Sequence, residues 1–281
     1  MSIRVALAAA LCATYAASAA AQAPPSGSPV ASQGRPAVPS PITDRFHLRS
    51  SYFAPSIDTD LRLDARDGTP GTPLTAEGDL GLDDRADQGR LELMIRMRER
   101  GRMRVDYFKL DRYAQRLLER TIDFGDETFL AGEQVATSID WRMLGFTYTY
   151  SALRLDRVEL GIGLGIHLLE AEARGEVRAR QQREEAAGAG AFPTGALDFA
   201  WRISRRFSLT ARGQYFSTSV EEFDGTLAEY HADVQYRWKP NFAIGLGYTA
   251  IRAELNISDD DFPGRFELDV SGPELFFRVS F

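Results

Sequence analysis

Apolar and polar residues alternate along most of the chain beyond residue 44. The clearest stretch lies at 158–168, where Val158, Leu160, Ile162, Leu164, Ile166 and Leu168 alternate with Glu159, Gly161, Gly163, Gly165 and His167. Side chains of a β-strand point to opposite faces in turn, so a period of two places all the apolar residues on one face. The pattern predicts a strand with one apolar face and one polar or glycine-rich face.

The same alternation recurs in other stretches, separated by turn residues. The predicted strands cover 45–64, 90–98, 102–111, 134–150, 157–173, 197–204, 209–216, 229–238, 244–250 and 265–281. Pro55 interrupts or bends the first of them, because proline has no backbone N–H to donate. Residues 112–124 fit either a short helix or a further extended segment. In the last strand the apolar face changes after Val270, which predicts a bulge near Gly272 and Pro273.

The connections alternate between long and short. Long polar connections are expected at 65–89, 125–133, 175–193, 218–227 and 257–264, and short ones at 99–101, 151–156, 204–206 and 239–241. If the chain enters and ends on one side, every short link lies on that side. This arrangement is typical of a transmembrane β-barrel with short periplasmic turns and long external loops. Residues 176–187, rich in Glu and Arg, are expected to form a short external helix.

The chain ends on an apolar stripe. Leu275, Phe277, Val279 and Phe281 share one face of the last strand. This ending resembles the terminal strand of bacterial outer-membrane β-barrel proteins, in which a final Phe preceded by alternate apolar residues is read by the barrel assembly machinery. The alternative is an edge strand of a soluble sandwich. The resemblance and the sorting of the connections together predict an all-β fold, a single antiparallel transmembrane β-barrel of about ten strands, with about eight or twelve as alternatives.

The N-terminal region predicts export. Residues 1–21 carry an early Arg4, an apolar run and small residues before a cleavage site after Ala21, as in a secretory signal peptide. Residues 22–44 are rich in proline and poor in large apolar side chains, so we expect a disordered periplasmic segment there. The barrel is expected over 45–281. The single cysteine, Cys12, lies in the signal. The expected location is the Gram-negative outer membrane, surrounded by lipid and lipopolysaccharide.

Composition excludes two classes of protein. The chain has 281 residues, of which 44% are hydrophobic and 26% charged, and its net charge is −7. Beyond the N-terminus no apolar run reaches the roughly 18 residues of a transmembrane helix, which excludes a helical inner-membrane protein. The acidic balance argues against nucleic acid as a partner.

Aromatic residues gather at the ends of the predicted strands, as in girdles at the two membrane interfaces. Those beside the short turns are Tyr148, Tyr150, Phe207, Trp238, Phe242 and Phe281, and those toward the long loops are Tyr215 and Tyr230.

The faces opposite the apolar stripes are expected to line the barrel interior. They carry Asp198, Arg202, Arg212, Gln214, Glu229, Asp233, Arg237, Glu274 and Arg278. Charges of both signs on adjacent strands favour internal ion pairs, because an unpaired charge in a narrow barrel is costly. A barrel of about ten strands is little wider than one of about eight, which side chains already fill. We therefore expect a filled barrel or, at most, a narrow polar channel.

One group of residues raises a catalytic hypothesis. His231 and Asp233 share a face near the external end, and Asp58 and Asp60 lie on the first strand. The arrangement resembles the omptins, outer-membrane proteases with an Asp/His pair and an acidic pair near the external rim. The order here, His before Asp, departs from that family's Asp-x-His, so no role is carried over. The expected role is non-enzymatic (membrane structure, narrow solute passage or surface interaction), and an omptin-like or lipid-modifying hydrolase is the alternative.

No cofactor and no specific metal site is expected. Acidic loop residues at Asp83, Asp84, Asp87 and 259–261 offer the oxygen ligands that Ca²⁺ and Mg²⁺ prefer. The glycine-punctuated spacing of a calcium loop is missing from both stretches. Loosely held divalent cations are the partners expected there.

Overall fold

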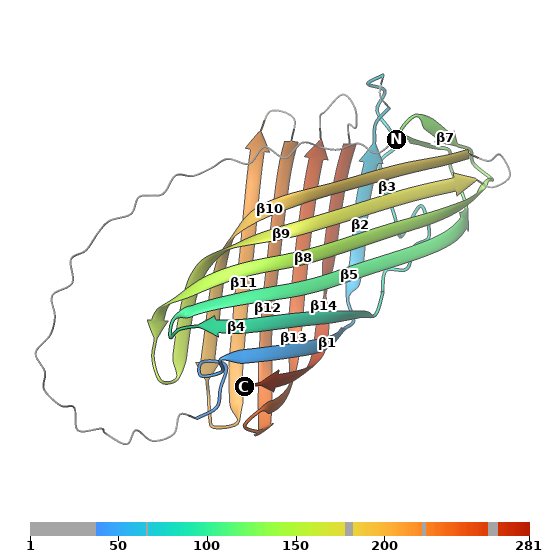
Figure 1. Ribbon diagram of the computed structural model, residues 1–281. Coiled ribbons are helices and arrows are strands. Elements are labelled where there is room, and N and C mark those ends of the chain that lie inside the picture. The colour runs from blue at the N-terminus through green and yellow to red at the C-terminus, as the bar shows by residue number, and fades with distance from the viewer. Residues whose placement is uncertain (1–37, 66, 178–181, 221–222, 258–263) are drawn as a thin grey trace, which may run out of the picture. The chain divides into compact units, whose positions relative to one another are not determined.

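A computed structural model describes residues 38–65, 67–177, 182–220, 223–257 and 264–281. The predicted signal peptide (1–21) and most of the proline-rich segment (22–37) lie outside the described residues. Every regular element in the described part of the chain is a β-strand (Figure 1). No helix there is long and apolar enough to span a membrane.

The strands are long and follow one another through tight turns. In chain order they are β1 (Phe46–Phe53), β2 (Ser56–Leu63), β3 (Leu74–Thr75), β4 (Gln88–Met97), β5 (Gly101–Leu117), β6 (Ile122–Phe124), β7 (Glu127–Phe129), β8 (Gln134–Arg154), β9 (Val158–Val177), β10 (Gln182–Arg202), β11 (Phe207–Val220), β12 (Phe223–Lys239), β13 (Phe242–Ile257) and β14 (Gly264–Ser280). The short links lie at 98–100, 155–157, 203–206 and 240–241, and each overlaps the link that the sequence predicts.

The sheet closes on itself through its first and last strands. β14 pairs antiparallel with β1 at its C-terminal half and with β2 at its N-terminal half. β1 and β2 are thus two parts of one wall strand, broken at Ala54 and Pro55. With these two counted together, the wall has ten strands, because among the strands of the described residues only β3, β6 and β7 lie outside it. The structure confirms the predicted ten-stranded barrel and the break at Pro55.

The structure decides one segment that the sequence left open and corrects one predicted helix. β5 continues to Leu117, and the β6–β7 hairpin follows it, so of the two alternatives for 112–124 the extended one is confirmed. β9 continues to Val177 and β10 begins at Gln182, so the external helix at 176–187 is wrong. Residues 178–181 lie outside the described part. The predicted long loops at 175–193 and 218–227 are mostly strand for the same reason: the barrel wall extends beyond its apolar belt.

The outward and inward faces exchange character partway along the strands. On β9 the outward face is apolar as far as Leu168 and carries Glu170 next, whereas the inward face is polar as far as His167 and carries Leu169 next. The same exchange occurs at the same level on β8, where Leu144 pairs with Leu168 and Arg142 pairs with Glu170. The barrel therefore has two zones. In the belt zone the outside is apolar and the inside polar, and in the external zone the order is reversed.

The height of the belt fits a membrane. A strand crosses the hydrocarbon core in about 9–11 residues when tilted by about 45°. The outward apolar run of β9, at 158–168, has this length, and Leu164 at its middle is 74% exposed. The belt zone is the transmembrane part of the barrel.

The same reversal explains the last strand. The register between β13 and β14 runs without a shift from Phe242 opposite Val279 to Ile257 opposite Gly264. The bulge predicted near Gly272 and Pro273 is therefore wrong. Val270 points inward like Glu274, because the interior beside Val270 is apolar and the interior beside Glu274 is charged.

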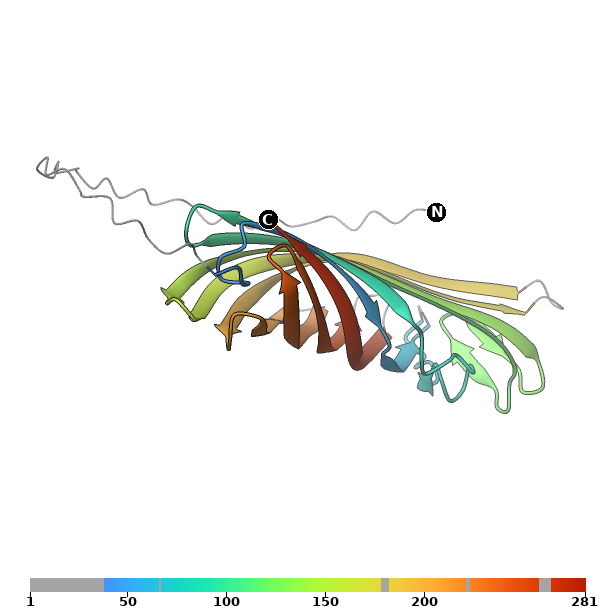
Figure 2. The ribbon, with the colours of Figure 1, turned by 90° about the horizontal axis from the view of Figure 1, so that it is seen from below.

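The external zone has an apolar core between two walls. Figure 1 shows β5, β8, β9 and β10 running across β11 to β14, and Figure 2 turns the same barrel by 90°. The core holds residues of both walls, such as Phe108 of β5 and Leu268 of β14. Trp141 of β8 stacks on Phe266 of β14, with ring centroids 5.7 Å apart. Packing of this kind joins two sheet faces as in a β-sandwich.

One seam interrupts the wall of the external zone. β4 pairs with β5 only as far as Tyr107, so the upper part of β5 has β8 as its strand partner. The loop between β2 and β4 fills the seam. Its Glu77 accepts a hydrogen bond from the backbone N–H of Thr59 at 3.0 Å and pairs with Arg112 of β5, which also donates to the Thr59 hydroxyl.

Candidate functional site

The interior of the belt zone is filled by charged side chains. Its arginines are Arg49, Arg90, Arg96, Arg102, Arg104, Arg212, Arg237 and Arg278, and its carboxylates are Asp44, Glu92, Asp106, Glu159, Asp198, Glu229, Asp233 and Glu274. The two sets are equal in number. We call them the charged core. A buried ion is tolerated only when its partners replace water, so this balance is a condition for the fold.

Ion pairs of the charged core cross the lumen. Arg49 of β1 donates to Asp233 of β12 at 2.9 Å and to Glu274 of β14 at 2.7 Å. Arg49 also stacks on the ring of Phe276, 3.7 Å from its centroid. One guanidinium thus joins three strands, since its planar fork can serve two carboxylates at once.

Further pairs join the other sides. Arg90 of β4 lies 2.7 Å from Glu229 of β12, and Arg96 of β4 lies 2.7 Å from Glu159 of β9. Arg104 of β5 lies 3.1 Å from Asp198 of β10. Each pair spans the interior between separate strands, and a small polar cavity of about 40 Å³ remains among them, beside Arg49, Arg104 and Asp198.

The residues predicted to line the lumen lie as follows. Asp198, Gln214, Glu229, Asp233, Arg237, Glu274 and Arg278 are buried in the interior, Arg212 pairs there with Glu92, and Arg202 is half-buried at the end with the short turns. Arg202 donates to the carbonyl of Val38 at 3.4 Å.

The sequence-based set omits more than half of the charged core, including Arg49, Glu92, Arg104 and Glu159. The signal for these residues was present, because they follow the same alternation on β1, β4, β5 and β9.

A short segment before β1 covers the base of the charged core. Asp44 accepts from Arg237 at 2.6 Å and from Arg278 at 3.0 Å. The carbonyl of Pro41 accepts from Arg96 at 3.4 Å, and Ile42 is buried. Residues 38–44 belong to the segment that the sequence predicts to be disordered, and in the structure several of them supply acceptors to these arginines.

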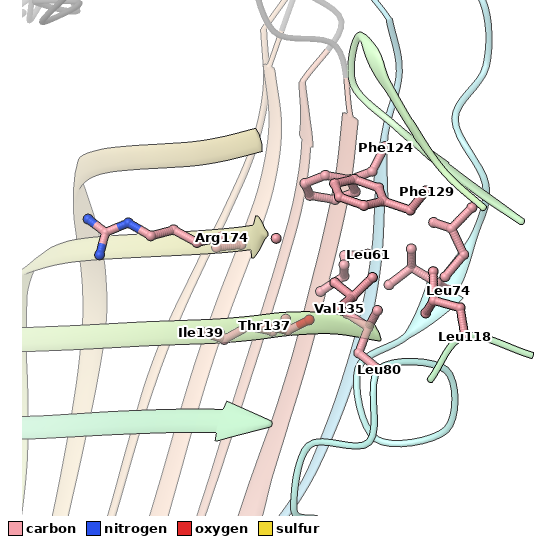
Figure 3. A pocket seen from close by; sticks show the side chains of 13 residues that line it. Leu61, Leu74, Leu80, Leu118, Phe124, Phe129, Val135, Thr137, Ile139 and Arg174 are labelled. Carbon is pink, nitrogen blue, oxygen red and sulfur yellow. The ribbon is translucent and has the colours of Figure 1, made fainter. Parts of the chain in front are cut away.

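A cavity lies in the external zone between the loop at 64–87, the β6–β7 hairpin and β8 (Figure 3). Its lining is almost wholly apolar and includes Leu61, Phe124, Phe129 and Ile139. A second apolar cavity of about 120 Å³ shares Leu61, Phe124 and Ile139 with it and extends to Phe266.

No protein-family model and no curated protein matches the chain. Among solved structures, the chain is similar to the outer membrane protease OmpT of Escherichia coli, with a TM-score of 0.53 and 10% identity over 86% of this chain and 98% of that chain. It is also matched to OprG of Pseudomonas aeruginosa, with a TM-score of 0.34 and 10% identity over 84% of this chain and 94% of that chain. This chain has the fold of a bacterial outer-membrane β-barrel protein.

The outer-membrane barrel does not assemble the omptin-like group of side chains. His231 and Asp233 are buried in the charged core, where they bond each other at 2.9 Å. Asp58 and Asp60 lie on the outward face of β2. The two pairs therefore lie on opposite sides of the barrel wall. A shared substrate could not reach both pairs, since a catalytic group must lie within hydrogen-bond reach of the reacting atoms.

The outward side chains of the barrel include its aromatic residues. Tyr148, Tyr150, Phe207, Trp238 and Phe281 are exposed toward the short turns, Phe242 is half-exposed there, and Tyr215 and Tyr230 are exposed at the other boundary of the belt.

The terminal stripe also points outward, with Leu275, Phe277 and Phe281 exposed and Val279 half-exposed. Phe281 pairs through its backbone with Phe46, as expected of a closing strand. Its recognition by the assembly machinery stays a prediction.

Cation binding at the acidic loops also stays a prediction. Asp83 and Asp84 are exposed, and the carbonyl of Asp84 accepts from the N–H of Ile57 at 2.8 Å. Residues 259–261 lie outside the described part of the chain.

Proposed function

We propose that this protein resides in the outer membrane of a Gram-negative bacterium as a closed, non-enzymatic barrel that displays its external zone at the cell surface. The observation that carries the proposal is the charged core, in which ion pairs such as Arg49–Asp233 and Arg104–Asp198 cross the lumen. An open pore needs a continuous water-filled path, and polar interiors of this kind leave one only in wider barrels.

Conductance in planar bilayers tests closure. We expect the purified protein to give no single-channel steps, and the same result for a variant that lacks residues 22–43, because ion pairs such as Arg49–Asp233 and Arg104–Asp198 join wall strands without that segment. Steps in the wild type would overturn the proposal. Steps in the truncated variant alone would overturn closure by the charged core and assign it to the segment before β1.

Location is tested by membrane fractionation and by heat-modifiable migration on gels. We expect the protein in the outer-membrane fraction and an N-terminus at Gln22 after processing. A protein found soluble in the periplasm would contradict the proposal.

A second candidate role is the capture of a small apolar molecule from outside the cell. It is supported by the apolar cavity of about 120 Å³ beside Leu61, Ile139 and Phe266. In another protein an apolar cavity of about 150 Å³ binds benzene or xenon. Both apolar cavities lie in the external zone, away from the charged core.

Xenon is the probe for this role. We expect xenon to shift the methyl resonances of Leu61 and Ile139, and Ala173→Leu, which fills both cavities, to abolish the shift. Ala136→Leu, on the outward face of the neighbouring strand β8, is the matched control and should leave the shift intact. Unchanged wild-type spectra would remove this role.

The hydrolase alternative is tested with His231→Ala. Surface protease and lipase activities of intact cells are compared with those of the wild type. Equal activities are expected under the non-enzymatic proposal, and a loss in the variant would support the hydrolase instead.

A further inference from the structure

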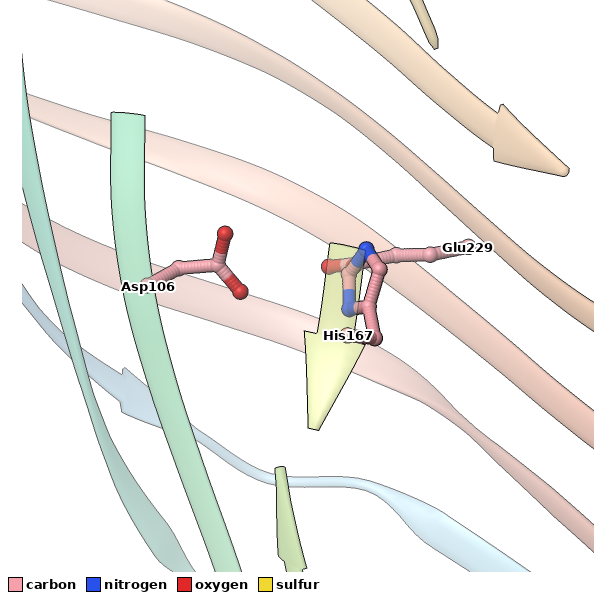
Figure 4. Close-up of side chains that lie close together, drawn as sticks. All are labelled: Asp106, His167 and Glu229. Carbon is pink, nitrogen blue, oxygen red and sulfur yellow. The ribbon is translucent and has the colours of Figure 1, made fainter. Parts of the chain in front are cut away.

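Three metal-ligating side chains converge inside the barrel from separate strands. Asp106 of β5, His167 of β9 and Glu229 of β12 each offer one ligand atom, and these atoms lie within 4.8 Å of one another (Figure 4). Their exposed fractions are 4%, 0% and 1%. In the described part of the chain this is the one group of three or more such residues.

Each of the three side chains has one polar atom that makes no hydrogen bond with the described residues. Asp106 Oδ2, His167 Nδ1 and Glu229 Oε2 have no hydrogen-bond partner among the described residues. Glu229 uses its other oxygen to pair with Arg90 at 2.7 Å. Asp106 differs from the other carboxylates of the charged core, because no ion pair with a described arginine reaches it. Arg90 and Arg212 attract Asp106 only from a longer range than an ion pair. A buried carboxylate without a direct ion pair is costly, and a bound cation would supply that pair.

The histidine is oriented to present a lone pair. His167 Nε2 lies 2.9 Å from Gln214 Oε1, which also accepts from the hydroxyls of Thr147 at 3.1 Å and Thr194 at 3.0 Å. An amide oxygen only accepts, so Nε2 carries the proton and Nδ1 of the neutral ring is left as a ligand. Metal-binding histidines are held in this manner by a hydrogen bond from the second ring nitrogen.

The site is sealed on its external side and has room for its carboxylate. The next inward residues toward the outside are Phe108 after Asp106, Leu169 after His167 and Leu227 before Glu229, and all three are buried in the apolar core. A glycine stands opposite Asp106 on β8. A Cβ at Gly145 would lie 2.8 Å from both oxygens of the Asp106 carboxylate, so any larger residue would displace that ligand.

We propose that Asp106, His167 and Glu229 bind one divalent transition-metal ion, of which Zn²⁺ is the probe. One imidazole nitrogen with two carboxylate oxygens suits Zn²⁺ or Mn²⁺, whereas Ca²⁺ takes about six to eight oxygen ligands. The ligands meet only when β5, β9 and β12 are in one barrel, so the ion binds during folding and ties three strands together. This site is independent of the proposed surface role.

The test is refolding in detergent with Zn²⁺, followed by gel filtration and metal analysis of the heat-modifiable, folded fraction. We expect about one zinc per chain in the wild type and none in Asp106→Asn or His167→Gln, since each removes a ligand. Gln214→Ala should weaken zinc binding about 10–100-fold. His47→Gln is the matched control, because His47 is also buried in the interior but pairs with Glu92 at 2.9 Å; it should retain zinc.

Two results would contradict the proposed metal site. The first is a wild type without zinc, which would assign the unpaired lone pairs to a shared proton. The second is zinc retained by folded Asp106→Asn and His167→Gln. If these variants do not fold, electron paramagnetic resonance of Cu²⁺-loaded wild type decides: coupling to a single histidine nitrogen supports the site, and its absence contradicts it.

Discussion

At the scale of residues, arginine is the side chain that makes the interior possible. Arg49 satisfies Asp233 and Glu274 on two different strands, and its aromatic contact with Phe276 covers the guanidinium plane. A lysine would offer a point charge in place of this fork. The exposed pair Arg252–Asp269, at 2.7 Å on the outward face, has similar geometry but remains in contact with solvent.

These two pairs predict different costs for the same substitution. Arg49→Met leaves two buried carboxylates without their partner and should lower the free energy of unfolding by about 3–5 kcal/mol. Arg252→Met removes an exposed pair and should cost less than about 1 kcal/mol. Urea unfolding in lipid vesicles measures both. Similar midpoints for the two variants would mean that the charged core contributes no more than a surface pair.

Asp79, in the loop that fills the seam, should make the stability of that loop depend on pH. The Arg120 guanidinium, 3.0 Å from Asp79, holds the pKa of that carboxyl below its usual range. A lowered pKa stabilises the folded loop at pH above the ordinary value of about 3.9, and this contribution is lost as the pH falls through the lowered pKa. Carboxyl NMR titration should place Asp79 below ordinary aspartate in the wild type and nearer to it in Arg120→Gln. An unchanged titration in the variant would assign the shift to another group.

At the scale of elements, the seam between β2 and β5 depends on one carboxylate. Glu77 holds the backbone of Thr59 and the buried Arg112, so it closes a gap that strand pairing leaves open. The strands themselves need no such support, because β8 and β9 pair over most of their length.

Glu77→Ala should therefore open the seam. Hydrogen bonds to charged groups contribute about 1.5–3 kcal/mol, which corresponds to at least about tenfold in an opening equilibrium. Protease cleavage within 64–87 should speed up by a similar factor. Glu119→Ala, whose side chain is 82% exposed, is the control and should leave the rate unchanged. Equal cleavage of both variants would show that Glu77 does not hold the loop.

At the scale of the whole molecule, the barrel divides into a belt zone and an external zone of opposite polarity. The levels of the exchange agree between neighbouring strands, since Tyr107 pairs with Leu144 and Lys109 with Arg142. A barrel surrounded only by water, or only by lipid, would have outward side chains of one polarity along its whole height. Lipid around the belt and water around the external zone account for both halves with one rule, namely that apolar side chains avoid water.

One substitution in each zone tests this division. Leu164→Arg, near the middle of the belt, should destabilise the barrel in a bilayer by about 2–4 kcal/mol. Ser138→Arg, outward on β8 in the external zone, should change stability little, because its side chain meets water. Unfolding from lipid vesicles measures the difference. Equal effects would contradict the placement of the belt.

The alternation along the sequence was enough to predict the ten strands, the break at Pro55, the short turns and the apolar stripe that ends at Phe281. A period of two is a local property, and each strand carries it whether or not its partners are known. The prediction was wrong where one face was assumed to stay polar throughout. At Val270 and over 176–187 the outward and inward faces exchange polarity where the strand leaves the belt zone. The sequence-based prediction interpreted this exchange as a bulge at the first place and as a helix at the second.

Tertiary structure alone decided which charges meet. Asp106, His167 and Glu229 are far apart in the sequence and come together because ten tilted strands close at one register. Strand number and stagger fix which side chains share a level inside a barrel, and no local pattern encodes them. The sequence by itself thus determined the strands and their apolar faces. Closure of the barrel decided the ion pairs across the lumen, the seam held by Glu77 and the three-strand metal site that we propose.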